Sequence, residues 1–228
     1  YGKAEYFNPG ESVKDRAALF IVQNALKKKL IAKGGTIVEG TAGNTGIGLA
    51  IVCKEYGLKL KIVIPKTQSI EKKKTLISLG AELIEVKAVP YSDPKNYIKQ
   101  SKKIAEDLNK TDKNGVYWAN QFDNTINTEA HIKTTSQEIW SQTNGKVDAF
   151  TCSVGTGGTL AGTSIGLKEK NKNIKIALSD PMGSSLYSYI KNNKLENTGN
   201  SITEGIGTGR ITKNFEKALI DDAFQIDD

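Results

Sequence analysis

Short apolar runs alternate with longer amphipathic segments along most of the chain. Several of the short runs are rich in β-branched residues and end at Gly or Pro, which is typical of strands, whereas the longer segments space their apolar residues as helices do. The predicted strands cover 36–38, 60–64, 83–86, 115–119, 149–153 and 174–178. The predicted helices cover 45–56, a basic segment ending near Leu79, a segment that Asp93-Pro94 caps and opens, 128–140 and 159–168.

This alternation predicts an α/β fold with mostly parallel sheets and helices on both faces. Ligands in such folds bind beyond the carboxyl ends of the strands, where loops lead into helix N-termini. Two glycine-rich loops occupy such positions, EGTAGNTG after the first strand and SVGTGGT after the strand at 149–153. The polar stretch Gln121–Asn127 is a candidate boundary between two sub-domains.

The loop Gly155-Thr156-Gly157-Gly158-Thr159 has the composition of an anion-binding loop. Glycines let successive backbone N–H groups converge, and the following helix adds the positive end of its dipole. The loop lacks the Gly-Lys-Ser/Thr of a P-loop and departs from the dinucleotide-binding fingerprint. It is therefore either a phosphate-binding loop or a tight turn.

The loop Thr41-Ala42-Gly43-Asn44-Thr45-Gly46 also joins a strand to a helix. Its hydroxyls and amide, together with the N–H groups of a helix N-terminus, suit a carboxylate and a neighbouring polar oxygen. The alternative is a helix cap with glycines for close packing.

Lys14 follows the turn Asn8-Pro9-Gly10 and falls in the first turn of a predicted helix. A cation opposes the helix dipole there, whereas a neutral, imine-forming lysine suits the position better. Most lysines are surface groups, so this residue alone establishes no site. Together with the two loops, however, it completes the set needed to hold pyridoxal phosphate and an amino acid.

Four segments, NPGESVKDR, EGTAGNTGIGLA, SVGTGGTLAGT and GIGTGRI, closely resemble the motifs of the cysteine synthase and cystathionine β-synthase family of fold type II pyridoxal-phosphate enzymes. They occur in the family's order and span nearly the whole chain. The resemblance implies that Lys14 binds the cofactor covalently and that Asn44 hydrogen-bonds its 3′ oxygen. It implies phosphate contacts from Gly155, Thr156, Gly157, Gly158 and Thr159, substrate-carboxylate contacts from Thr41, Gly43, Asn44, Thr45 and Gln121, and a loop at the cofactor face formed by Gly205, Ile206 and Gly207.

The resemblance also implies an activity and an architecture. The activity is β-replacement, in which Lys14 removes the α-proton of O-acetylserine and sulfide replaces the acetyl group to give cysteine. The architecture is two three-layer sub-domains with the cofactor in the cleft between them, one at 8–123 and one at 124–228 together with 1–7. A cytoplasmic homodimer without metal is expected. A sister activity, such as cystathionine formation from serine, and a non-catalytic scaffold stay open as alternatives.

The chain departs from the family in two respects. Position 42 is Ala where many members carry Ser, which bears on amino-acid preference. Family members also have a segment before Tyr1, and they continue past Asp228 to a further strand and a hydroxyl that faces the cofactor's ring nitrogen. On this basis the chain as given is expected to bind cofactor poorly.

Composition and charge weigh against a nucleic-acid-binding protein and a membrane protein. The chain carries 32 basic and 25 acidic residues, a net charge of +7. The lysine runs 27–29 and 72–74 contain no interleaved Arg or aromatic residue, so they indicate solvated helix faces rather than a nucleic-acid surface. No apolar run approaches the roughly 20 residues of a membrane helix. Cys53 and Cys152 are expected to be reduced core thiols, and His131, the single histidine, is expected to have a structural or surface role rather than a catalytic one.

Overall fold

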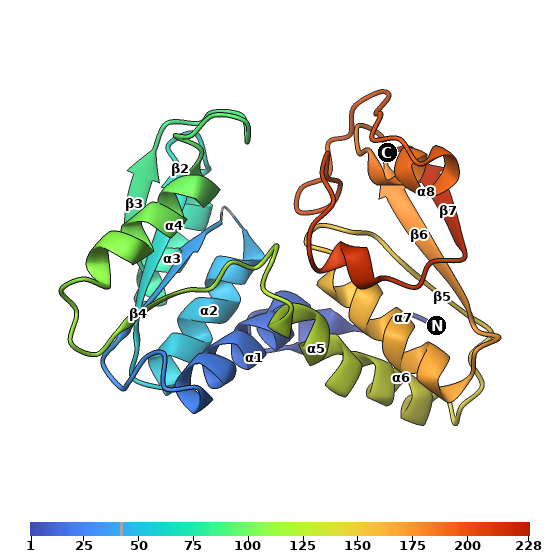
Figure 1. The fold of residues 1–228 in the computed structure, drawn as a ribbon, viewed down its shortest axis with the longest axis horizontal. Helices are drawn as coiled ribbons and strands as arrows, with labels where there is room; N and C mark the ends of the chain where they lie inside the picture. Colours follow the sequence, from blue (N-terminus) through green and yellow to red (C-terminus); the bar gives the residue numbers. More distant parts are fainter. Residues whose placement is uncertain (42) are drawn as a thin grey trace. The chain divides into compact units, whose positions relative to one another are not determined.

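The computed structural model describes residues 1–41 and 43–228, which divide into two compact units, Tyr1–Gln121 and Phe122–Asp228 (Figure 1). The sequence predicts this boundary after residue 123 and groups residues 1–7 with the second half. In the structure these N-terminal residues belong to the first unit. Glu5 of the short 3-10 helix η1 (Glu5–Phe7) forms an ion pair there with Arg16, at 2.8 Å.

The described strands of the first unit form a parallel sheet in the order β3-β2-β1-β4. Val38 and Val63 pack with Ala105 of α4 on one face of the sheet. A Cβ at Gly46 of α2 would approach Ile62 and Leu76 of α3, so α2 and α3 cover the other face. The elements are α1 (Lys14–Lys27), β1 (Thr36–Gly40), α2 (Asn44–Glu55), β2 (Lys59–Pro65), α3 (Ile70–Ser78), β3 (Glu82–Val86), α4 (Tyr97–Leu108) and β4 (Val116–Trp118).

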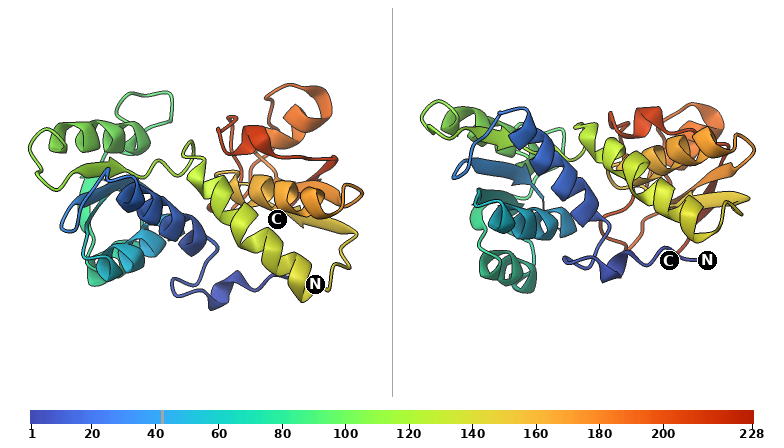
Figure 2. Two further views of the ribbon diagram at one scale, coloured as in Figure 1. Left: turned by 60° about the horizontal axis from the view of Figure 1, so that its bottom comes forward. Right: turned by 90° about the horizontal axis from the view of Figure 1, so that it is seen from below.

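The second unit contains a parallel sheet in the order β5-β6-β7. Helix α7 packs against β5, and α8 packs against β6 and β7. Helices α5 and α6 lie alongside α7, as both views of Figure 2 show. The elements are α5 (Ile126–Lys133), α6 (Thr135–Gln142), β5 (Ala149–Cys152), α7 (Gly158–Lys170), β6 (Lys175–Pro181), α8 (Leu186–Asn192), η2 (Phe215–Lys217) and β7 (Asp222–Ile226).

The predicted α/β class with parallel sheets is confirmed, and so are the six predicted strands, with ends shifted by a few residues. The prediction of one helix over 128–140 is wrong. The chain leaves helical geometry at Thr134, where φ is −121° and ψ is −72°, and two helices result. The Thr134 hydroxyl donates to the Ala130 carbonyl at 2.7 Å, in addition to the backbone Thr134 N–H at 3.0 Å.

The prediction that Asp93-Pro94 opens the following helix is also wrong. Helix α4 starts at Tyr97, and the Asn96 side chain caps it by accepting a hydrogen bond from the Ile98 N–H at 3.0 Å. Asp93 instead accepts from the Lys95 N–H at 2.7 Å, a local turn that precedes the helix. None of the helices in the described ranges has the length and apolar character needed to cross a bilayer.

Candidate active site

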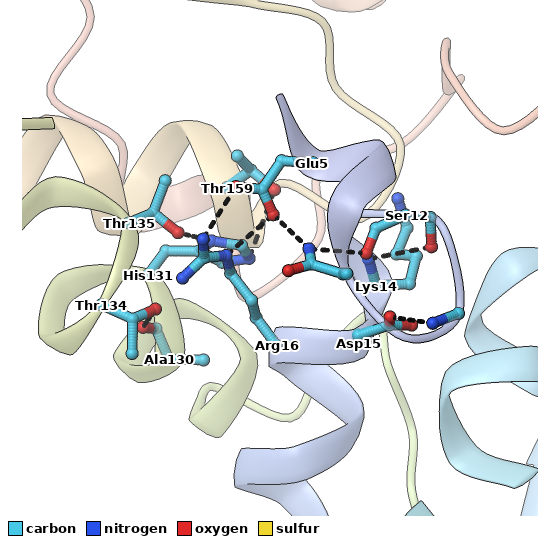
Figure 3. Close-up of polar contacts among 12 residues, drawn as sticks. Glu5, Ser12, Lys14, Asp15, Arg16, Ala130, His131, Thr134, Thr135 and Thr159 are labelled. Atoms are coloured by element: carbon cyan, nitrogen blue, oxygen red, sulfur yellow. Dashed lines mark hydrogen bonds and ion pairs between the residues drawn. The ribbon is translucent and has the colours of Figure 1, made fainter. Parts of the chain in front are cut away.

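Lys14 is the first residue of α1, as predicted. The turn before it is tied to the helix by Asp15, whose Oδ2 accepts a hydrogen bond from the Gly10 N–H at 2.5 Å (Figure 3). The Ser12 hydroxyl accepts from the Lys14 N–H at 3.3 Å. Burial raises the pKa of the Asp15 carboxyl, and the Gly10 N–H partly offsets this effect. These contacts fix the backbone of Lys14 at the positive end of the helix dipole.

Helices α1 and α2 run side by side in the same direction. A Cβ built at Gly48 would lie 3.2 Å from Asp15 Cα, so the helices touch closely near their starts. Further along, the Gln23 side chain donates to the Tyr56 hydroxyl at 2.8 Å. Asp15 thus faces Gly48 near the helix starts, and Gln23 faces Tyr56 further along. The N-termini of α1 and α2 therefore lie at the same end of the helix pair. Lys14 and the loop that opens α2 therefore share one edge of the first unit.

The loop between β1 and α2 brings several predicted residues together. Thr41 Oγ1 accepts from the Gly43 N–H at 3.2 Å, and the Thr45 hydroxyl donates to Gln121 Oε1 at 2.5 Å. Thr41, Thr45 and Gln121 are buried, whereas the Asn44 side chain at the first position of α2 is exposed. Ala42 lies outside the described residues. Because the N-cap residue is Gly43, no side chain of the described residues caps the first N–H groups of α2.

The glycine-rich loop of the second unit is shaped by close backbone approaches. Gly157, the N-cap residue of α7, has φ of 91°, and a Cβ there would lie 2.7 Å from the Phe215 nitrogen. A Cβ at Gly155 would lie 2.2 Å from the Gly205 carbonyl oxygen. The Gly207 N–H donates to the Val154 carbonyl at 2.8 Å. The predicted loops at 155–159 and 205–207 therefore lie against each other.

Several residues that support this loop were missed by sequence reasoning. The Asn127 side chain donates to the Thr156 hydroxyl at 2.9 Å, and the Thr212 hydroxyl donates to the Thr156 carbonyl at 2.7 Å. His131 lies within 3.3 Å of the Thr159 hydroxyl through Nε2 and 2.8 Å of the Thr135 hydroxyl through Nδ1 (Figure 3). Asn127 stood at the end of a recognised polar stretch, but nothing in the sequence tied these side chains to the loop.

The two cysteines lie in or against the apolar cores of the two units. Neither forms a disulfide within the described residues. Burial raises the pKa of the Cys53 thiol to about 12, so that thiol stays protonated in the core of the first unit. Cys152 is half-buried at the end of β5 and packs against the core of the second unit.

Comparison with known proteins places these loops in a family. The family model described as "Pyridoxal-phosphate dependent enzyme" matches residues 1–228. Cysteine synthase 1 of Neurospora crassa is 54% identical over 232 residues, which cover 100% of this chain and 60% of that protein. The chain thus spans about three fifths of the length of the curated relatives it matches.

Solved structures agree with this assignment. A hydrogen sulfide-producing enzyme from Fusobacterium nucleatum has a TM-score of 0.85 and 38% identity, covering 99% of this chain and 70% of that one. An O-acetylserine dependent cystathionine beta-synthase from Helicobacter pylori has a TM-score of 0.84 and 35% identity, covering 100% of this chain and 70% of that one. The resemblance to cysteine synthases inferred from the motifs is confirmed, and the chain belongs to the family of pyridoxal-phosphate dependent enzymes.

Proposed function

We propose that the protein makes cysteine from O-acetylserine and sulfide by β-replacement, with pyridoxal phosphate as cofactor. The observation that carries the proposal is that three of the four family motifs lie at a helix N-terminus suited to their task. Lys14 starts α1, the 41–45 loop starts α2, and the glycine loop starts α7. The identity of 54% to a cysteine synthase supports the choice of reaction.

The residues present fit the phosphate of the cofactor. The start of α7 follows a glycine in the left-handed region, so its first backbone N–H groups receive no side-chain cap from the described residues. Uncapped N–H groups at a helix N-terminus form an anion site. We assign the phosphate to Gly155, Thr156, Gly157, Gly158 and Thr159. The Thr156 hydroxyl accepts from Asn127, which leaves its own O–H to donate to the phosphate beside the backbone N–H groups.

The covalent and carboxylate-binding roles belong to residues of the first unit. Lys14 binds the cofactor covalently and moves the α-proton of the substrate. Thr41, Gly43, Asn44, Thr45 and Gln121 hold the substrate carboxylate, and we also assign to Asn44 the hydrogen bond to the cofactor's 3′ oxygen. Gly205 belongs to the loop beside the cofactor. When bound, the cofactor supplies an electron sink for the carbanion chemistry.

The experiment that tests the proposal compares two product assays on the full chain with added cofactor. O-acetylserine and sulfide should give cysteine and acetate. The competing candidate is cystathionine formation, which is favoured by the likeness to the Helicobacter pylori enzyme and is assayed with O-acetylserine or serine and homocysteine. Faster cystathionine formation would replace the proposed reaction, and inactivity in both assays with bound cofactor would reject both. The homodimer and the cytoplasmic location expected from the sequence stay predictions.

A further inference from the structure

Glu39 is a buried carboxyl group for which the proposed reaction has no use. It lies on β1, two residues before Thr41, and only 1% of it is exposed. Burying a carboxyl without partners is costly, so a carboxyl retained in a strand interior needs a reason. Hydrogen bonds reach Glu39 from the backbone N–H groups of Asn120 and Gln121 and from the Gln121 side chain. Its Oε2 accepts none from the described residues.

The backbone opposite Glu39 is shaped to meet it. Asn120 has φ of 49°, in the left-handed region that non-glycine residues rarely adopt. A residue in this region turns successive N–H groups toward one point and so forms an anion-binding concavity. The carboxyl of Glu39 lies at that point, where it receives both N–H groups. The unfavourable conformation at Asn120 and the buried carboxyl therefore account for each other.

The same carboxyl sets which way the Gln121 amide points. The Gln121 nitrogen donates to Glu39, while its Oε1 accepts the hydrogen bond from Thr45. If the amide were flipped, its oxygen would face Glu39, and an N–H would take the place of the oxygen that accepts from Thr45.

We propose that Glu39 is a positioning residue for the substrate carboxylate, acting through Gln121 and Thr45. Glu39 fixes the 120–121 peptide and the amide, and Gln121 in turn fixes the hydroxyl of Thr45 at the start of α2. The inference rests on the proposed function, because it takes Gln121 and Thr45 to bind that carboxylate. It predicts that a change at Glu39 weakens binding of carboxylate-bearing amino acids without weakening cofactor binding.

The test uses Glu39→Met, which keeps a side chain of similar length but has no oxygen to accept the hydrogen bonds from Asn120 and Gln121. Glu55→Met, at an exposed glutamate on α2, is the matched control. In the full chain with bound cofactor, the visible absorption change reports binding of L-alanine and of L-alaninamide, which lacks the carboxylate. Glu39→Met should raise the dissociation constant of L-alanine about tenfold, the effect of losing one hydrogen bond to a charged group. Affinities for L-alaninamide and for the cofactor should be unchanged.

A double-mutant cycle asks whether Glu39 acts through Gln121. If it does, Glu39→Met should add no further loss for L-alanine in a Gln121→Ala background. Should Glu39→Met fail to show a cooperative melting transition, Glu39→Asp replaces it, since it withdraws the carboxyl by one methylene and predicts the same selective loss.

Different results would reject the role of Glu39 and the proposed function. Equal losses for L-alanine and L-alaninamide, a matching loss of cofactor affinity, additive effects in the cycle, or no effect at all would each overturn the role of Glu39 and leave the proposed function standing. A parent protein that binds no cofactor would reject the proposed function, and the inference with it.

Discussion

The side chain of Asn127 contacts the start of α7 at two places, Thr156 and Gly158. Its nitrogen donates to the Thr156 hydroxyl at 2.9 Å, and its Oδ1 lies 2.1 Å from the position that a Cβ at Gly158 would occupy. The proposed phosphate loop is therefore held by a residue from another helix that leaves no room for a side chain. This contact explains why a glycine opens α7, apart from any conformational freedom it provides.

Gly158→Ala should displace Asn127 and weaken cofactor binding. Overpacking of this kind costs about 1–3 kcal/mol, and the displaced amide also loses its bond to Thr156. The measurement is cofactor titration followed by absorbance, together with the melting temperature. Gly209→Ala is the control, because a Cβ there meets its nearest atom, Ser185 Oγ, at 3.9 Å. If both variants bind cofactor like the parent, the loop does not hold the phosphate.

Glu39 should make the stability of the protein depend on pH. Burial raises its pKa from 4.5 to about 8, against the opposing hydrogen bonds from Gln121 and Asn120. Between these values the folded state keeps a proton that the unfolded state releases. The stabilisation is complete below pH 4.5 and is lost as pH rises through about 8, by about 1.4 kcal/mol per pH unit.

Glu39→Gln should flatten that part of the profile, since an amide does not titrate. Urea denaturation of parent and variant across this pH range gives the two slopes, and their difference isolates Glu39 from other titrating carboxyls such as Asp15. The charge of Glu39 also contributes, after burial, to the raised pKa of Tyr97, so Tyr97 should titrate at lower pH in the variant. Parallel slopes for the two proteins would mean that Glu39 is ionised in the folded state.

Asn96→Ala should destabilise α4 by about 1 kcal/mol, the usual effect of removing an N-cap side chain. The variant loses the bond from the Ile98 N–H and a second one to the Val89 carbonyl, at 2.9 Å. Lys103→Ala, an exposed site on the same helix, is the control. The midpoint of chemical denaturation measures both. A loss no larger than that of the control would show that the cap contributes nothing to stability.

Local features of the fold could be predicted from sequence because they depend on neighbouring residues. The strand at 36–38 is apolar and β-branched, and Lys14 follows a turn that sets the start of its helix. The break at Thr134 falls inside 128–140, where the helical pattern of apolar residues continues and does not reveal it. The cap of α4 was misplaced because Asp93 and Asn96 have equally suitable side chains.

The candidate site was predictable in its backbone loops and not in the side chains around them. Several glycines close together in sequence predict an anion-binding loop, and this pattern pointed to residues 155–159. Asn127, Thr212 and His131 reach that loop only through folding, and so does Glu39 in its contact with Gln121. Such contacts join segments far apart in the chain, and no local pattern encodes them.

Mapping the site of covalent attachment tests directly whether Lys14 carries the cofactor. The full chain is incubated with pyridoxal phosphate, reduced with borohydride, digested and examined by peptide mass spectrometry. We expect one pyridoxyl label per chain, on Lys14. The label should be absent from Lys14→Ala and unchanged in Lys27→Ala, which alters an exposed lysine of the same helix. A label of equal extent in Lys14→Ala, or one spread over surface lysines of the parent, would contradict it.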